Sequence, residues 1–547
     1  MPASTRRTLG PSLPTPLGPA LVCLGLALIF AAAIAWPALI VALELARAGP
    51  VRPAADSRDF FGPGTLAMLV RTFAAAAVVS LAAVAVAYPA AWAIRSRRAI
   101  LPFLLIPLFL PSYVAYAGWG VLRAPGTRLA AWIARGSVDA LELKTRLAYD
   151  LQAVLGLSLW AWPIAAIVIA AGLTRLDPDL LDTLRLEPAS ARRRALTLLN
   201  LTRAPILWAF AIIFVLMLGS AVPFHVAQLE TYAIAIWRLI DLTAPADRWR
   251  VWVAASPLVL ITLAIGAILA RKLFSLADTD SQPAPVDAPP LPTRAGRLAL
   301  AWTVLLWIAA VIVPVSMLAT TMDEPTAAVR FAARHWPALR DTFATALVVA
   351  AVAWFITTAV WFLADRGSRA SAVAAACVVL AIGVAPVPGL LVGLATARAW
   401  ALFGATQPVA DSAAVVVLAH TARFAFVPAL AGWWLARTQT RTLRDLRRID
   451  GADSLVGWFR SCFPTNAWVT LAAAAAVAML SIQEIEASIM VIPPGYHSLA
   501  EWMLQQLHAL RQDDLAAGAL FLTVLAVATA ILIAICLRIG RPEPIRS

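Results

Sequence analysis

The chain has 547 residues, of which 61% are hydrophobic and only 14% are charged, and its mean hydropathy is +0.81. A soluble protein normally carries about 25% charged residues, so this composition excludes an ordinary soluble domain. The net charge of +14 does not indicate a nucleic-acid partner, because the arginines gather in short gaps between apolar blocks, as the positive-inside rule describes for cytoplasmic loops.

Apolar blocks of about twenty residues follow one another along the chain, and each is long enough to cross a bilayer as a helix. We therefore predict an all-α, polytopic membrane protein. The first block follows Arg6 and Arg7 and is too long for a signal-peptide core, so we interpret it as a span. The twelve predicted spans are 18–44, 66–93, 99–121, 151–174, 204–222, 249–273, 297–319, 341–364, 371–396, 412–436, 466–490 and 514–538.

The basic residues of the gaps predict the orientation of the chain. They concentrate in the even-numbered gaps, for example "IRSRR" at 94–98 and the arginines of 175–203. Cytoplasmic loops are enriched in Lys and Arg, so both termini are expected in the cytoplasm of a cell with the protein in its inner (plasma) membrane. The gap 122–150 is a partial exception, because it carries basic residues on the predicted outer face.

A Pro-rich stretch divides the chain into two halves of six spans each. We predict a first half at 1–276, a cytoplasmic linker at 277–296 and a second half at 297–547. The second span of each half begins alike, with "RTFAAAAVV" from Arg71 and "DTFATALVV" from Asp341. Such self-similarity indicates an internal duplication.

One charged segment follows the fourth span in each half of the chain. The second is "LRDLRRIDGADSLVGWFRSCFP", from Leu443 to Pro464, and the first runs from Leu181 to Pro205. The matched positions are Asp182 with Asp445, Arg185 with Arg448, Glu187 with Asp450, Pro188 with Gly451, and Ala189 with Ala452.

Leu443, Leu446 and Ile449 recur every three residues and put apolar side chains on one face of a short helix. Gly451 predicts a turn before a second short helix. A solvated connector obeying the positive-inside rule is the plainer interpretation. A connector needs only a few residues, however. Two matched segments of more than twenty residues therefore favour a docking element for a soluble partner or for the membrane surface.

These segments resemble the EAA motif of ATP-binding-cassette (ABC) transporter permeases. Asp445-Leu446-Arg447 stands at the E-A-A place, Gly451 at the glycine, and Ser461-Cys462-Phe463-Pro464 at the final I-x-L-P. In the first half Asp182-Thr183-Leu184 stands at the E-A-A place and Pro188 replaces the glycine. "SIQEIEASIMVIPPGYHSLAEWMLQQLH", from Ser481, is similar to a segment of the ferric-iron-type permeases, and "AHTARFAFVPALAG", from Ala419, is similar to their fourth span.

The resemblance implies a type I importer permease whose two halves are related by pseudo-two-fold symmetry. It implies that the charged segments couple to two ABC ATPase subunits, and that a periplasmic or extracellular binding protein delivers the substrate. The chain itself would then be no enzyme, with no catalytic residue and no cofactor of its own. ATP would be bound by the partners, since no phosphate-binding loop occurs in the sequence.

Ferric iron is the substrate that the resemblance favours, and importers of thiamine, polyamines or phosphonates share the architecture. An ion-gradient-driven transporter of the major facilitator type is the alternative from another class, because it also has twelve spans and "FLADRGSR" at 362–369 is distantly similar to one of its loops.

Ionisable residues inside spans are costly and mark candidate functional positions. His420 and Arg423 share a face of the tenth span, and Glu484 ends the eleventh, so these three are the candidates for a translocation path. Glu484 and Glu486 are two residues apart and would not face each other on a helix. The four cysteines form no CxxC pair, and no metal site is expected.

Overall fold

The computed structural model describes residues 17–47, 63–186, 190–244, 247–278, 293–324, 326–366, 368–439, 441–509 and 511–540. Every regular element in these ranges is a helix. Eight helical stretches are long and apolar enough to cross a membrane, so the protein is an all-helical, multi-pass membrane protein. They are Leu17–Arg47, Gly64–Ser96, Val138–Leu173, Trp249–Lys272, Arg294–Ala319, Trp336–Ala364, Phe463–Gln483 and Gln512–Ile539.

Four further pairs of helices are apolar enough to span but bend sharply at a short break. With each pair counted as one span, the described chain reaches the predicted number of twelve. The bends are 73° between Arg98–Phe109 and Ser112–Arg123, 64° between Arg192–Leu201 and Arg203–Leu218, 117° between Arg369–Val384 and Gly389–Ala401, and 50° between Ala413–Phe424 and Phe426–Arg437.

Proline causes the breaks in the third and ninth predicted spans. Pro111 precedes α6 (Ser112–Gly120), and Pro388 precedes α20 (Gly389–Ala401). A proline has no N–H for the preceding turn and disfavours a helical conformation in the residue before it. Both prolines have a ψ of 132°. The two broken helices thus occupy the same ordinal place in the two halves of the chain.

Two threonines of the repeated motif make the same hydrogen bond in both halves. Thr72, in α4 (Pro63–Ser96), accepts a bond of 2.8 Å from the backbone N–H of Tyr232, the first residue of α13 (Tyr232–Leu242). Thr342 accepts a bond of 2.9 Å from the N–H of Leu499 at the start of the corresponding helix. Each hydroxyl satisfies a donor that the first turn of a helix leaves without a partner.

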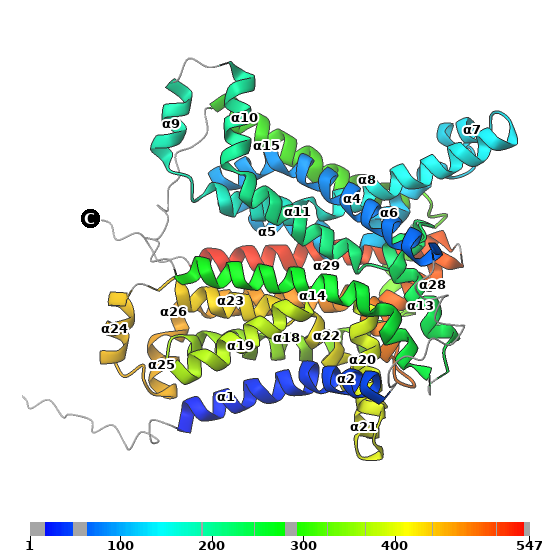
Figure 1. The fold of residues 1–547 in the computed structure, drawn as a ribbon. Helices are drawn as coiled ribbons and strands as arrows, with labels where there is room; N and C mark the ends of the chain where they lie inside the picture. The colour runs from blue at the N-terminus through cyan, green and yellow to red at the C-terminus, as the bar shows by residue number, and fades with distance from the viewer. Residues whose placement is uncertain are drawn as a thin grey trace, which may run out of the picture.

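The first span of each half packs against the other half. In the first half this span is α1 (Leu17–Phe30), a π-turn and α2 (Trp36–Arg47), and α1 lies along two helices of the second half, α18 and α19. The corresponding span of the second half, α15 and α16, packs against α4 and α6 (Figure 1). The bounds are Trp336–Ala364 for α18, Ser368–Val384 for α19, Thr293–Trp307 for α15 and Val313–Ala319 for α16.

Tryptophan side chains attach the first span of each half to the helices of the other half. The indole N–H of Trp36 donates to the carbonyl of Ala399 at 3.1 Å. In the other half Trp302 donates to the carbonyl of Val86 at 2.8 Å. An indole N–H within a membrane span has no water to donate to, so these bonds add direction to an otherwise apolar contact.

Short helices gather at two opposite ends of the bundle (Figure 1). One end carries the helices of the two charged segments, and the other carries the short helices between the remaining spans. The first group is α9 (Pro178–Leu186), α10 (Ala191–Leu201), α24 (Arg441–Ile449) and α25 (Leu455–Ser461). The second includes α7 (Arg128–Ile133), α13, α21 (Gln407–Ala410) and α28 (Leu499–His508).

Candidate functional site

The second charged segment folds as helix, turn and helix. Gly451, between α24 and α25, has a φ of +87°. Its N–H donates to the carbonyl of Arg448 at 3.0 Å, and the N–H of Ala452 donates to that of Arg447 at 2.9 Å. This pair of bonds is a Schellman motif, which favours glycine because only glycine takes positive φ without strain. The predicted turn therefore lies at Gly451.

Arginines of α24 hold this segment against the end of α18. Arg444 Nε lies 2.7 Å from the carboxylate of Asp365, and the carbonyl of the same residue accepts a bond of 3.3 Å from Arg448. Arg447 donates to the hydroxyl of Thr465 at 3.0 Å, just inside the next span. Burial raises the pKa of the Asp365 carboxyl, and the neighbouring arginines counter part of that rise.

An aromatic side chain anchors the second helix of the segment. Trp458, on α25, is buried, and its ring centroid lies 4.8 Å from that of Trp361 and 5.2 Å from that of Phe362. Both contacts are edge-to-face, the arrangement that aromatic quadrupoles favour. Arg366 donates to the carbonyls of Asp453 (2.5 Å) and Ala452 (2.9 Å) and closes the turn from the other side. The segment is thus a rigid part of the bundle.

The outer surface of this segment combines charge with exposed apolar side chains. Leu446 is 54% exposed and Ile449 is 82% exposed. Asp445 and Asp450 are also exposed, and a side chain added at Gly451 would meet open space. Of the other predicted residues, Arg448 is exposed, Ala452 is buried in the turn, and Pro464 lies in the first turn of the eleventh span.

The corresponding segment of the first half forms two helices at the same end of the bundle (Figure 1). Asp182 and Arg185 lie on α9. Glu187, Pro188 and Ala189 lie outside the described residues. Ser190 caps α10 by accepting from the N–H of Arg193 at 3.3 Å. Leucines are exposed here too, among them Leu180, Leu186, Leu196 and Leu199.

The three residues predicted for a translocation path lie close together inside the bundle, near the break before α20. They come from the ends of α22 (Ala413–Phe424) and α26 (Phe463–Gln483), and a fourth ionisable residue, Glu486, begins α27 (Glu486–Val491). Arg423 donates to the carbonyls of Ala385 (3.2 Å) and Val387 (2.5 Å) in the break itself.

His420 is buried and has a hydrogen-bond partner at each ring nitrogen. Nδ1 lies 2.8 Å from the hydroxyl of Ser481, and Nε2 lies 2.8 Å from that of Ser488. The Ser488 hydroxyl donates to the carbonyl of Glu484 at 2.8 Å, so it is left to accept from a proton on Nε2. In the neutral ring Nδ1 then accepts from Ser481. His420 therefore ties α22 to both α26 and α27.

Glu486 connects this cluster to the first half of the chain. Its Oε1 accepts from the backbone N–H groups of Ala221 (2.8 Å) and Val222 (3.3 Å) and from the hydroxyl of Ser220 (3.3 Å). Oε2 lies 3.9 Å from a guanidinium nitrogen of Arg423. A carboxylate at the first amides of a helix complements both the free donors and the dipole.

The side chains of Glu484 and Glu486 both approach the same glycine, Gly389. The eleventh span ends at Gln483, and Glu484 has an extended conformation with a ψ of 123°. A Cβ atom built on Gly389 would lie 3.2 Å from Glu484 Oε1 and 3.0 Å from Glu486 Oε2. The expectation that the two side chains diverge assumed that the helix continues. The break after Gln483 removes that assumption and places both carboxylates beside Gly389.

No group of three or more His, Cys, Asp or Glu side chains within the described ranges could hold a metal ion. A scan of protein-family models, a search of curated proteins and a search of solved structures each found no match to this chain.

Proposed function

We propose that this chain is the permease subunit of an ABC importer, in which the α24–α25 segment and its first-half counterpart α9–α10 are docking sites for two ATPase subunits. One observation carries the proposal. At the end of the bundle that holds both charged segments, the α24–α25 segment fixes exposed apolar side chains, Leu446 and Ile449, on a rigid, strongly charged support.

The rigidity of the segment favours docking over a plain connector. A connector needs neither a buried tryptophan anchor nor three arginine contacts to the bundle. A coupling element needs both, because a motion of the partner reaches the spans only through a firm attachment. Exposed apolar side chains within a polar rim are typical of a protein interface.

The cargo would cross where the two halves meet. We assign His420, Arg423 and Glu484 to the region next to this path, because they surround the break before α20, and broken helices form the substrate sites of many transporters. Opening a path there requires the bonds of Glu486 to the first half to rearrange. Ferric iron is the proposed substrate from the sequence resemblance, and thiamine, a polyamine and a phosphonate are the competitors to assay beside it.

The test is co-purification with an ABC ATPase encoded next to this chain's gene. We expect Gly451→Trp to reduce the recovered ATPase at least tenfold, because an indole there projects into open space on the docking face. Gly451→Asn is the matched control for the backbone, since asparagine tolerates positive φ with a small side chain. Gly404→Trp is the control for bulk, because Gly404 is also open but lies beside α21 at the opposite end.

Equal recovery of the ATPase with Gly451→Trp and with both controls would refute docking at this segment. Substrate uptake into liposomes on an ion gradient, with purified protein and no ATPase, would identify a secondary transporter instead.

A further inference from the structure

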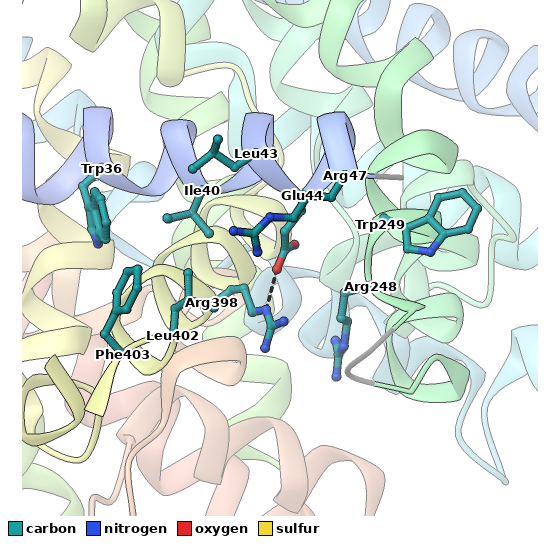
Figure 2. A pocket seen from close by; sticks show the side chains of 10 residues that line it. All are labelled: Trp36, Ile40, Leu43, Glu44, Arg47, Arg248, Trp249, Arg398, Leu402 and Phe403. Atoms are coloured by element: carbon teal, nitrogen blue, oxygen red, sulfur yellow. Dashed lines mark hydrogen bonds and ion pairs between the residues drawn. The ribbon is translucent and has the colours of Figure 1, made fainter. Parts of the chain in front are cut away.

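A pocket of about 420 Å³ opens at the end of the bundle opposite the charged segments. It lies between α2, the start of α14 (Trp249–Asp278) and the end of α20. Three arginines and one glutamate line it, together with aromatic rings that include Trp36, Trp249 and Phe403 (Figure 2). The polar side chains come from both halves of the chain, which meet here because the first span is exchanged.

The glutamate of the pocket is already fully engaged. Glu44 Oε1 accepts from Arg398 Nε at 2.5 Å, and Oε2 accepts from the indole N–H of Trp252 at 2.8 Å. Figure 2 shows the Glu44–Arg398 pair among the side chains that line the pocket. The side chain of Glu44 is 12% exposed and that of Arg398 is 33% exposed, so the carboxylate is shielded from water while the guanidinium partly faces the pocket. One positive and one negative charge therefore cancel.

Two arginines remain without a compensating charge. The side chains of Arg47, at the end of α2, and of Arg248, just before α14, make no hydrogen bond or ion pair with any described residue. Among the described residues that line the pocket, three guanidinium groups stand against one carboxylate, which is an excess of two positive charges. The aromatic walls lower the local dielectric constant, which strengthens the attraction of such charges for an anion.

We propose that this pocket binds a phosphate-type oxyanion between Arg47 and Arg248. A planar guanidinium offers paired N–H groups that match two oxygens of a phosphate or phosphonate. A singly charged carboxylate would neutralise only half of the excess, whereas a phosphate dianion matches it. The same chemistry can come from a free phosphate compound or from the headgroup of an anionic lipid, because arginine and tryptophan also gather where a bundle meets lipid headgroups.

The proposed anion site does not depend on the proposed function. The arginines and aromatic side chains that line the pocket are the same whether or not an ATPase docks at the opposite end of the bundle. The first experiment titrates inorganic phosphate against the full-length protein in nanodiscs of phosphatidylcholine and follows tryptophan fluorescence. We expect saturable binding that weakens at least tenfold in the double variant Arg47→Gln/Arg248→Gln. Arg128→Gln is the matched control, since Arg128 is an exposed arginine of α7 at the same end without a described partner.

The second experiment uses nanodiscs of phosphatidylcholine and phosphatidylglycerol and counts retained lipids by native mass spectrometry. Retention of phosphatidylglycerol by the wild type and by Arg128→Gln, but not by the double variant, would assign the site to a lipid headgroup. Phosphate binding without selective lipid retention would assign it to a free anion. If the double variant binds phosphate and retains phosphatidylglycerol as well as the wild type does, the proposal is wrong. The double lysine variant, Arg47→Lys/Arg248→Lys, keeps the positive charges but loses the paired N–H groups of the guanidinium. We expect it to bind phosphate with an affinity between those of the wild type and the double glutamine variant.

Discussion

Replacement of Glu486 by alanine should loosen the contact between the two halves of the chain. The carboxylate is buried and is the acceptor for two backbone N–H groups at the start of α12 (Val222–Val226). A buried donor that loses its acceptor costs about 1–3 kcal/mol. Two such donors, of which that of Ala221 has the shorter bond, lead us to expect a loss of about 3 kcal/mol in the free energy of unfolding.

A glutamine at the same position separates hydrogen bonding from charge. Glu486→Gln keeps an acceptor oxygen of nearly the same shape, so we expect a loss of only about 1 kcal/mol from the weaker, uncharged bonds. Glu230→Ala is the control for deleting a carboxylate, because Glu230 pairs with Arg238 at the surface (2.6 Å), and such pairs contribute about 0–1 kcal/mol.

The assay is unfolding of the purified protein in mixed micelles of dodecyl maltoside and SDS, followed by far-UV circular dichroism. The expected order of stability is wild type, Glu230→Ala, Glu486→Gln and Glu486→Ala, from highest to lowest. If Glu486→Ala unfolds at the same SDS fraction as Glu230→Ala, the carboxylate does not hold the halves together and the reasoning fails.

Two further predictions concern the two ends of the bundle. Trp458→Ala should free α25 and speed tryptic cleavage of the α24–α25 segment, because emptying a buried tryptophan site costs about 3–5 kcal/mol. Phe459→Ala is the control and should change the cleavage rate little, because the Phe459 ring is partly exposed. Equal cleavage rates for the two variants would contradict the role of Trp458 as an anchor. Burial, with His508 and Arg238 nearby, lowers the pKa of His225 from its ordinary 6.5. The unfolded chain therefore takes up the proton first, and stability should fall as the pH drops from about 7 through 6.5. Between pH 7.5 and 5.5 the free energy of unfolding should fall less in His225→Gln than in the wild type. An equal fall in both proteins would refute the role of His225.

Hydropathy and charge patterns located the spans and the helix–turn–helix of the α24–α25 segment, because both signals are local. A run of twenty apolar residues needs a helix in lipid, and Gly451 followed by a new apolar patch needs a turn. Local signals predict the helices on either side of Pro111 and Pro388 but not the bends between them. A proline inside a span can kink the helix, break it or be tolerated, according to its neighbours.

The sequence predicts only part of the polar cluster of His420, Arg423, Glu484 and Glu486. Glu484 is a candidate because it is an ionisable residue at the end of a span, whereas Glu486, which makes the contacts to the first half, is not among the candidates from the sequence. Its partners are 264 to 266 residues away along the chain. No periodicity carries information over such a separation. The one local signal available was the polar sequence Gln483-Glu484 at the end of an apolar run, which marks the end of the helix.

The exchange of the first spans has a consequence for the order in which the protein is made. When α1 and α2 leave the ribosome, their packing partners α18, α19 and α20 are still hundreds of residues from being synthesised. The first span must therefore wait in lipid, with its inward face uncovered, until the second half is inserted. The bundle can therefore be completed only after translation of the second half. A fragment that stops before α18 leaves this face of the first span uncovered, where chaperones and membrane proteases can recognise it.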